Sequence, residues 1–499
     1  MKTTIKAKLL EMPSEESEKL DNLMIRFSSA IRFAFNRRKP DAYDPMNKGD
    51  LEKLLQSKYK LNSRYAKDAV MKADSIISSQ KELVKEYHSN YKSKVKQVKQ
   101  ELKRAKSKQK IHALKTKLDK YQRKLEEYQK HLNEGTIPKV IFGGKENYKA
   151  RCEGKISNQE WKELRNNKFC SRGDKTKKGN LNTRIVLDKE DNIFLRINTS
   201  VKKNSSRYEY IKVPLYLPQK KNLEGEVNGR DYKSMVLKAV NKEKSYYVEV
   251  IHKDNQYFVH ITIEEKTPEI KSANPEQVGI IGIDTNPDGF ALTCLDQEGN
   301  YKWHKCITNP ELTSAKGNRR TNLCGELAKE VVEFIKNKGY SVAIEDLEFK
   351  RNRYGNKKFE RISHQFVYRK LLTFLERGCK REGVEVIKVN PAFTSIIGKY
   401  KYQHQFGISV HNSAALVIGR RALGFNERIP KQLIQVMSSY LNRVKFTKFI
   451  SSSQWSKWGK IDYLIKILIK NIKKKGGENP AYSKDYAYSR YRKRLLEIA

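Results

Sequence analysis

The chain has 499 residues, too many for one hydrophobic core, so several domains are expected. Lys and Arg total 103 against 57 Asp and Glu, and the resulting formal charge of +46 opposes compaction unless an anionic partner neutralises it. Because the charge is spread along the whole chain rather than gathered in one amphipathic segment, it favours nucleic acid over a membrane surface as the partner.

The N-terminus and the cysteines predict a cytoplasmic protein without a membrane anchor. Met1 to Leu10 alternates like a strand and does not resemble a secretory signal, and no apolar stretch is long enough for a membrane span. None of the six cysteines forms a C-x-x-C pair, so the sequence predicts reduced thiols and no zinc ribbon.

The first half predicts a helical lobe inserted into a small β-barrel. Residues 1–14 provide the first strand of the barrel, and residues 15–178 form the helical lobe. Residues 80–134 contain no Gly or Pro and carry two heptad-like seams in different phases, which predicts a basic coiled-coil hairpin over 85–133. A single long helix is the alternative. In either case, faces crowded with Lys suit a phosphate backbone.

Strand patterns dominate the next segment. Apolar runs flanking polar turns over 179–265 predict the hairpins of the β-barrel, and 266–277 reads as a linker. An α/β block follows over 278–430, and 431–499 is a basic, Tyr-rich tail. The predicted fold class is multidomain α+β, with an RNase H-like (RuvC) α/β domain after the barrel and helical lobe.

Two carboxylates follow buried-type strands in the α/β block. An apolar strand at 278–283 ends at Asp284 and is followed by two hairpins, as at the start of an RNase H-like sheet. A second apolar strand at 340–344 ends at Glu345. Carboxylates at the carboxyl ends of neighbouring strands lie side by side and suit Mg²⁺, and a pair of metals would align an attacking water with a leaving 3′ oxygen. The alternative is that Asp284 is only a turn residue and Glu345 only a helix cap.

Three segments resemble the RuvC motifs of the TnpB family, which comprises transposon-encoded RNA-guided nucleases related to type V CRISPR effectors. The segments are GIDTNPDGFAL, VAIEDLEFK and HNSAALVIGRR, and the stretch from Phe366 to Ser395 between the second and third also looks like that family. The resemblance implies an RNA-guided DNA endonuclease with a two-metal Mg²⁺ site, a guide RNA and a target DNA. In such proteins, pairing with the guide reads the target sequence.

The chain departs from the TnpB pattern in two places. The family commonly carries a four-cysteine zinc ribbon after the Thr-Ser segment, and residues 396–409 contain no cysteine. The third motif normally presents Asp at the start of a helix, and that position holds His411. We assign His411 with Asp284 and Glu345 as catalytic and metal-binding, because a neutral His binds metals or relays protons. The alternatives are a site that has lost an acid, or replacement of that acid by Glu427 or Asp288.

Basic residues flank the predicted site and are candidates for gripping the nucleic acid, with solvated loop charge as the alternative. They are Arg319, Arg320, Lys350, Arg351 and Arg353. Other functions stay open: a nuclease-deficient RNA-guided DNA-binding protein, a non-catalytic RNA-binding protein, or a recombinase of DNA ends. The sequence carries no signal for an oligomeric state.

Overall fold

The computed structural model describes most of the chain, namely residues 1–174, 176, 179–190, 192–203, 207–219, 224–225, 229–347, 365–441 and 443–475. The chain divides into two compact units, Met1–Lys266 and Thr267–Ala499. Within the described ranges, no helix combines the length and the apolar character needed to cross a bilayer.

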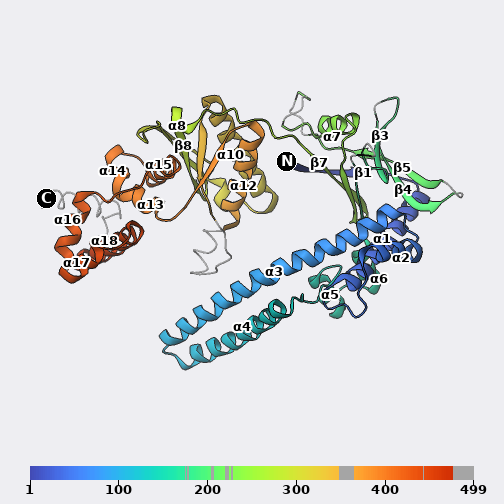
Figure 1. Cartoon of the computed structure of the whole chain (residues 1–499), viewed down its shortest axis with the longest axis horizontal. Helices are drawn as coiled ribbons and strands as arrows, with labels where there is room; N and C mark the ends of the chain where they lie inside the picture. Colours follow the sequence, from blue (N-terminus) through green and yellow to red (C-terminus); the bar gives the residue numbers. More distant parts are fainter. Residues whose placement is uncertain are drawn as a thin grey trace. The chain divides into compact units, whose positions relative to one another are not determined.

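A seven-stranded antiparallel sheet organises the first unit (Figure 1). Its strands, in the order β2-β6-β7-β1-β5-β4-β3, are β1 (Lys2–Leu9), β2 (Lys168–Arg172), β3 (Thr183–Leu187), β4 (Ile193–Lys202), β5 (Tyr208–Tyr216), β6 (Tyr247–Lys253) and β7 (Gln256–Glu264). The N-terminal strand joins the sheet as predicted, between β7 and β5. Among the described strands, β2 and β3 are edges that do not pair with each other. The sheet is therefore open and curled where a β-barrel was predicted.

Six helices are inserted between β1 and β2, in agreement with the predicted insertion. They are α1 (Ser14–Arg38), α2 (Lys48–Tyr59), α3 (Ser63–Arg104), α4 (Lys108–Glu134), α5 (Lys145–Cys152) and α6 (Asn158–Asn166). The apolar stripe of α1 predicts its buried face, which includes Leu20, Phe27 and Ile31. Two details differ from the prediction. The strand β2 lies within the segment 15–178 predicted as helical, and α7 (Tyr232–Asn241) lies within 179–265.

The two long helices α3 and α4 form an antiparallel hairpin (Figure 1). The ring centroid of Tyr91 lies 5.9 Å from that of Tyr121 and 5.7 Å from that of Tyr128, while Tyr87 lies 5.3 Å from Tyr128. The predicted hairpin is therefore confirmed, with its turn within 105–107, and the alternative of one long helix is wrong.

A five-stranded sheet forms the centre of the second unit. Its strands are β8 (Ile280–Asn286), β9 (Gly289–Leu295), β10 (Tyr301–Thr308), β11 (Ser341–Glu345) and β12 (Val386–Val389), in the order β10-β9-β8-β11-β12. The first three strands are antiparallel neighbours, and β11 runs parallel to both β8 and β12. This order and these directions are those of the RNase H-like sheet predicted from the sequence.

Helices cover both faces of this sheet. Ile281 and Ile283 of β8 pack in one core with α10 (Gly317–Lys338) and α12 (Gln365–Glu382). Ile280 packs in a second core with α15 (Val410–Ala422) and α18 (Gln454–Lys475). Because side chains alternate along a strand, the even-numbered positions of β8, including Asp284, face the α15 layer.

Short helices complete the second unit. They are α8 (Pro275–Val278), α9 (Glu311–Ser314), α13 (Thr394–Ile397), the π-helix η2 (Gly398–Tyr402), α14 (Gln403–Phe406), α16 (Lys431–Tyr440) and α17 (Arg443–Ile450). The elements α13, η2 and α14 occupy the stretch where the TnpB pattern has its zinc ribbon. The segment 431–499, predicted as a tail, is helical over much of its length as far as Lys475, and Ile461 and Ile465 of this segment are buried.

Candidate active site

Asp284 and Glu345 are brought together by the pairing of β8 with β11. Ile283 lies opposite Ile344 in this parallel pair, so the next residues, Asp284 and Glu345, are neighbours on the face toward α15. Asp284 is 7% exposed, and Glu345 is half-buried. The two acids predicted from the strand ends are therefore adjacent, and neither is only a turn residue or a cap.

His411 joins this pair from the start of α15. Ser409 caps the helix by accepting a hydrogen bond from the Asn412 backbone N–H at 3.0 Å, which makes His411 the second helical residue. The His411 Nδ1 lies 3.1 Å from Asp284 Oδ2, and 59% of the His411 side chain is exposed against 9% of that of Asp284. The imidazole thus connects a buried carboxylate to solvent.

Two glycines let α15 lie directly on the sheet. A Cβ at Gly282 would fall far inside contact distance of the Ala415 carbonyl oxygen and 2.6 Å from the Gly419 backbone nitrogen. A Cβ at Gly419 would in turn lie 2.6 Å from Leu295 Cδ1. The close approach of helix and strand backbones depends on both glycines, and it sets the distance between His411 and Asp284.

Gly282→Ala is therefore expected to push α15 from β8 and to destabilise the fold by about 1–3 kcal/mol or more, the usual size of overpacking. Thermal unfolding measures this effect as a fall in Tm. Gly325→Ala is the matched control, because nothing lies within 4 Å of its added Cβ in α10. That control should be neutral or stabilising. An unchanged Tm for Gly282→Ala would show that the two backbones are not in contact.

Burial dominates the electrostatics of the two acids. It raises the pKa of Asp284, with the hydrogen bond from His411 opposing the rise. Burial likewise raises the pKa of Glu345 to about 7; the hydrogen bond from Thr394 opposes the rise, and the charge of Asp284 adds to it. The pKa of His411 is raised by its hydrogen bond with Asp284. The charge of Asp284 thus makes ionisation of Glu345 less favourable.

Three neighbours of the site received no role from the sequence. The Thr394 hydroxyl donates a hydrogen bond of 2.5 Å to Glu345 Oε1. Arg421 donates to the backbone carbonyls of Asn390 and Ala392, which holds the loop that carries Thr394. Burial and the charges of Asp284 and Asp288 raise the pKa of Tyr368 to about 12. All three residues lie in segments that resemble TnpB. This resemblance was the sequence signal that could have pointed to them.

Glu427, one alternative for the missing acid, is committed elsewhere. Its side chain, 3% exposed, pairs with Lys401 and Arg420 and accepts a hydrogen bond of 2.6 Å from the Tyr402 hydroxyl. It therefore ties η2 to α15 and is not available to the site. Asp288, the other alternative, raises the pKa of His411 and so lies within electrostatic range of it.

Comparisons with known proteins bear on both units. Residues 2–276, more than half of the chain, match the family model described as the SSO2105 N-terminal domain. The chain belongs to that family. The match ends just before β8, so the family covers the sheet and helices of the first unit and does not include Asp284, Glu345 or His411. No curated protein matches the chain.

Several solved structures are similar to this SSO2105 N-terminal domain protein. RuvC from Thermus thermophilus is 16% identical with a TM-score of 0.21, covering 28% of this chain and 90% of RuvC. A Cas12f1–sgRNA–target DNA complex is 12% identical, with a TM-score of 0.23 and coverage of 84% and 99%. The mini-RNA-guided endonuclease CRISPR-Cas_phi3 is 10% identical, with a TM-score of 0.37 and coverage of 86% and 94%. At these scores, the similarities assign no function.

The acidic pair of this family member suits a hard divalent cation in its donor chemistry. Mg²⁺ prefers carboxylate oxygens and commonly takes one or two from the protein, with its other ligands from water and substrate phosphate. Positive charge beside Asp284 and Glu345 would also favour their ionised forms, which burial disfavours. Over the described ranges, no three His, Cys, Asp or Glu side chains are grouped to hold a metal ion by themselves.

The predicted nucleic-acid residues fall into two groups. Arg319 makes a bidentate ion pair with Glu311 at 2.7 and 2.6 Å, and Arg320 follows it on α10. Lys350, Arg351 and Arg353 lie outside the described residues. Contact of either group with nucleic acid remains a prediction.

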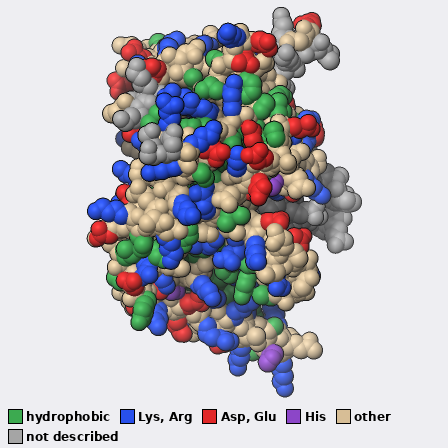
Figure 2. Space-filling model, turned by 90° about the vertical axis from the view of Figure 1, so that its right-hand side faces the viewer, with side chains coloured by type: hydrophobic (Ala, Val, Ile, Leu, Met, Phe, Trp, Pro, Cys, Tyr) green, Lys and Arg blue, Asp and Glu red, His purple; other side chains and the backbone are tan. Residues whose placement is uncertain are grey.

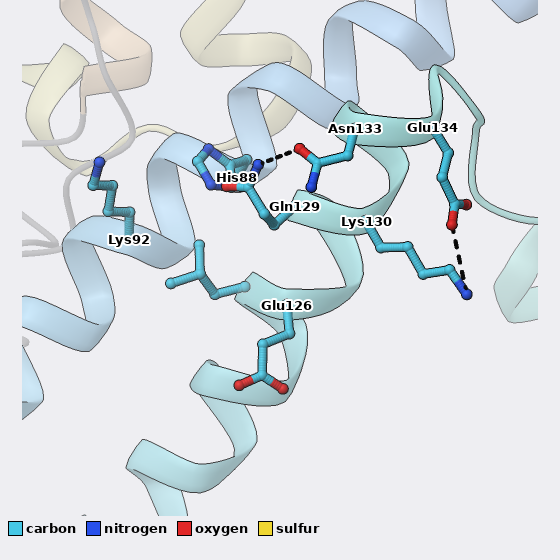
Figure 3. Close-up of a pocket in the computed structure, with 8 residues that line it drawn as sticks. His88, Lys92, Glu126, Gln129, Lys130, Asn133 and Glu134 are labelled. Atoms are coloured by element: carbon cyan, nitrogen blue, oxygen red, sulfur yellow. Dashed lines mark hydrogen bonds and ion pairs between the residues drawn. The ribbon is translucent and has the colours of Figure 1, made fainter.

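A hollow on the α3–α4 hairpin of this family member lies far along the chain from the acids (Figure 3). Its polar side chains bond to one another, Gln129 to Asn133 at 2.8 Å and Lys130 to Glu134 at 3.8 Å, while His88 and Lys92 project from α3. Because its charges are of both signs and Lys130 already pairs with Glu134, we assign no chemistry to it.

Proposed function

We propose that this chain is a transposon-associated, RNA-guided DNA endonuclease of the TnpB kind, acting in the cytoplasm. In this proposal the second unit hydrolyses phosphodiester bonds. The convergence of Asp284, Glu345 and His411 on one face of an RNase H-like sheet is the observation that supports it most strongly. The resemblance of the three segments to TnpB motifs adds the guide RNA and the target DNA as partners.

Each side chain has a role in the proposed hydrolysis. Asp284 and Glu345 would hold Mg²⁺, which supplies Lewis acidity and charge neutralisation at the phosphate. Asp284 orients the imidazole of His411 through Nδ1, so that the exposed ring edge is directed toward solvent and accepts a proton from the attacking water. Thr394 fixes one oxygen of Glu345, and Arg421 fixes the loop that carries Thr394.

A second candidate is a guide-directed DNA-binding protein that does not cut. The His at the third-motif position favours it, as does the lack of a three-ligand metal cluster among the described residues. This candidate shares the RNA partner of the first and differs only at the acidic site.

Purification from its host tests the shared part of the proposal. The protein is expected to carry one dominant structured RNA. Because of the +46 charge, RNA binding should weaken about a thousandfold or more over a fourfold rise in salt. A random RNA mixture without enrichment would contradict a guide. Cleavage of DNA matched to that RNA, with Mg²⁺ and not with a chelator, then separates the nuclease from the non-cutting binder.

A further inference from the structure

One face of β3, β4 and β5 in the first unit carries side chains that are exposed or only partly buried. Leu195, Val213 and Leu215 point inward and are buried in the core. The alternate positions of β3, β4 and β5 point outward, and we call six of them the basic–aromatic face: Arg184, Phe194, Arg196, Tyr210, Lys212 and Tyr216. Figure 2 views the molecule from the right-hand side of Figure 1, and on the face that it shows, Lys and Arg side chains are spread among hydrophobic ones.

Three cations of this face lie in a row across adjacent strands. Arg184 is the cross-strand partner of Arg196, and Arg196 is the partner of Lys212. Like charges directly opposite one another destabilise a sheet, because their Cβ atoms are only about 5 Å apart. Repulsion within this row therefore destabilises the free protein, and a bound anion would reduce that repulsion.

Within the described parts of β3, β4 and β5, this face presents cations without carboxylates beside them. The outward positions of β3, β4 and β5 contain no Asp or Glu, and Glu209 of β5 points inward to Lys19 of α1. Hydrogen bonds from Asn192 within the β3–β4 turn lower the pKa of Asp188, and the charge of Lys212 lowers it further. Among the described residues, Arg196 Nε is buried without a hydrogen-bond partner.

Aromatic rings alternate with these cations. The guanidinium of Arg196 lies 4.6 Å from the ring centroid of Tyr210, and the Lys212 ammonium lies 4.0 Å from that of Phe194. Tyr210 and Tyr216 remain 41% and 53% exposed, and Tyr216 pairs across strands with Lys8. Exposed rings that lie between cations suit a ligand that has both flat faces and phosphates.

We propose that the basic–aromatic face binds a single-stranded segment of nucleic acid. Its bases stack on Tyr210 and Tyr216, and its phosphates lie against Arg184, Arg196 and Lys212. A duplex fits less well, because its base faces are hidden by stacking, and an acidic peptide would leave the rings without a role. The inference rests on the proposed function only in taking nucleic acid as the partner.

The charge row is tested on the full-length protein, washed free of nucleic acid at high salt, with a short poly(A) RNA and a poly(dA) of equal length. Replacing Arg184, Arg196 and Lys212 together with Gln should weaken binding. The slope of log affinity against log salt should also become shallower by about 2, since each single-strand phosphate contact contributes about 0.7. Lys53, Lys67 and Lys162 replaced with Gln form the control with the same change of net charge. An equal loss in that control would overturn the proposal.

The rings are tested separately. Tyr210→Leu and Tyr216→Leu keep the net charge, and each should weaken single-strand binding roughly tenfold to a hundredfold while leaving duplex binding unchanged. Equal weakening for a duplex, or undiminished affinity for single strands, would refute stacking on this face. Polyglutamate bound as tightly as poly(A) would also refute it. Comparing poly(A) RNA with poly(dA) then shows whether RNA or DNA binds more tightly.

Two further measurements keep this inference separate from the proposed nuclease. Thermal unfolding of each variant shows whether the sheet is intact. No fall in Tm is expected, because all replaced side chains point outward and removing the row of cations relieves like-charge repulsion. Binding is repeated in Asp284→Asn with a chelator present, where it should equal that of the parent. Absence of DNA cleavage by the parent would count against the nuclease and leave this result standing, whereas single-strand binding independent of the face would refute only the inference.

Discussion

Asp284→Asn and Glu345→Gln are each expected to reduce Mg²⁺-dependent DNA cleavage by about a thousandfold or more. The reason is that each replaces a carboxylate of a buried pair, and charge stabilisation by a bound metal is worth several kcal/mol, each 1.36 kcal/mol being tenfold in rate. RNA binding should be unchanged, because the acids face α15 on the sheet of the second unit. Single-turnover cleavage and RNA retention measure the two effects.

Stability separates loss of chemistry from loss of fold in these variants. Burial disfavours both charges, and Asp284 raises the pKa of Glu345 further, so neutralising either acid should leave Tm at or above the parental value. Glu326→Gln, on the exposed face of α10, is the control and should cut like the parent. Parental cleavage by either site variant would show that these two acids do not hold the metal.

His411→Ala is expected to lower the cleavage rate on the order of 10²–10⁴-fold, the usual size of a general acid–base contribution. The geometry favours this adapted role over that of a degraded metal ligand. Asp284 engages Nδ1 at 3.1 Å and so orients the ring, and more than half of the side chain reaches solvent. An imidazole held in this way can pass a proton between the site and water.

His411→Asp distinguishes the two roles. An aspartate near the start of α15 would be stabilised by the helix dipole and would restore the TnpB pattern. If His411 is a degraded ligand, this variant should cut faster than the parent and bind Mg²⁺ more tightly. We expect no gain. His304→Ala, an exposed histidine on β10, is the control and should be neutral. Parental activity in His411→Ala would remove His411 from the site and leave Asp288 as the candidate nearby.

The sequence by itself determined the helices and strands and the order of the candidate catalytic residues along the chain. Apolar runs that end in Asp284 and Glu345 predicted two neighbouring strands, because buried parallel strands have apolar residues on both faces. The heptad spacing of α4 and the break in phase near Ala105 predicted the hairpin, since only two antiparallel helices bury both seams. The replacement of the usual Asp by His411 was visible from the third motif without a structure.

Only the tertiary structure decided which side chains meet. Glu427 is a plausible acid in the sequence, yet Lys401 and Arg420 neutralise it in another core, and Tyr402 donates a hydrogen bond to it there. Residues far apart in the chain converge at that place. Thr394 reaches Glu345 across 49 residues of sequence, a contact that no local pattern encodes.

Whether the predicted barrel closes depends on the same long-range packing. Strand patterns show that strands exist and which side of each is apolar, whereas closure depends on pairing between distant edges. The edges β2 and β3 stay unpaired with each other among the described strands, and the sheet remains open. Local periodicity was therefore enough to predict the helices and strands and the candidate acids. Long-range packing decided the geometry of the site, because hydrogen bonds and ion pairs form between whichever groups the fold places in contact.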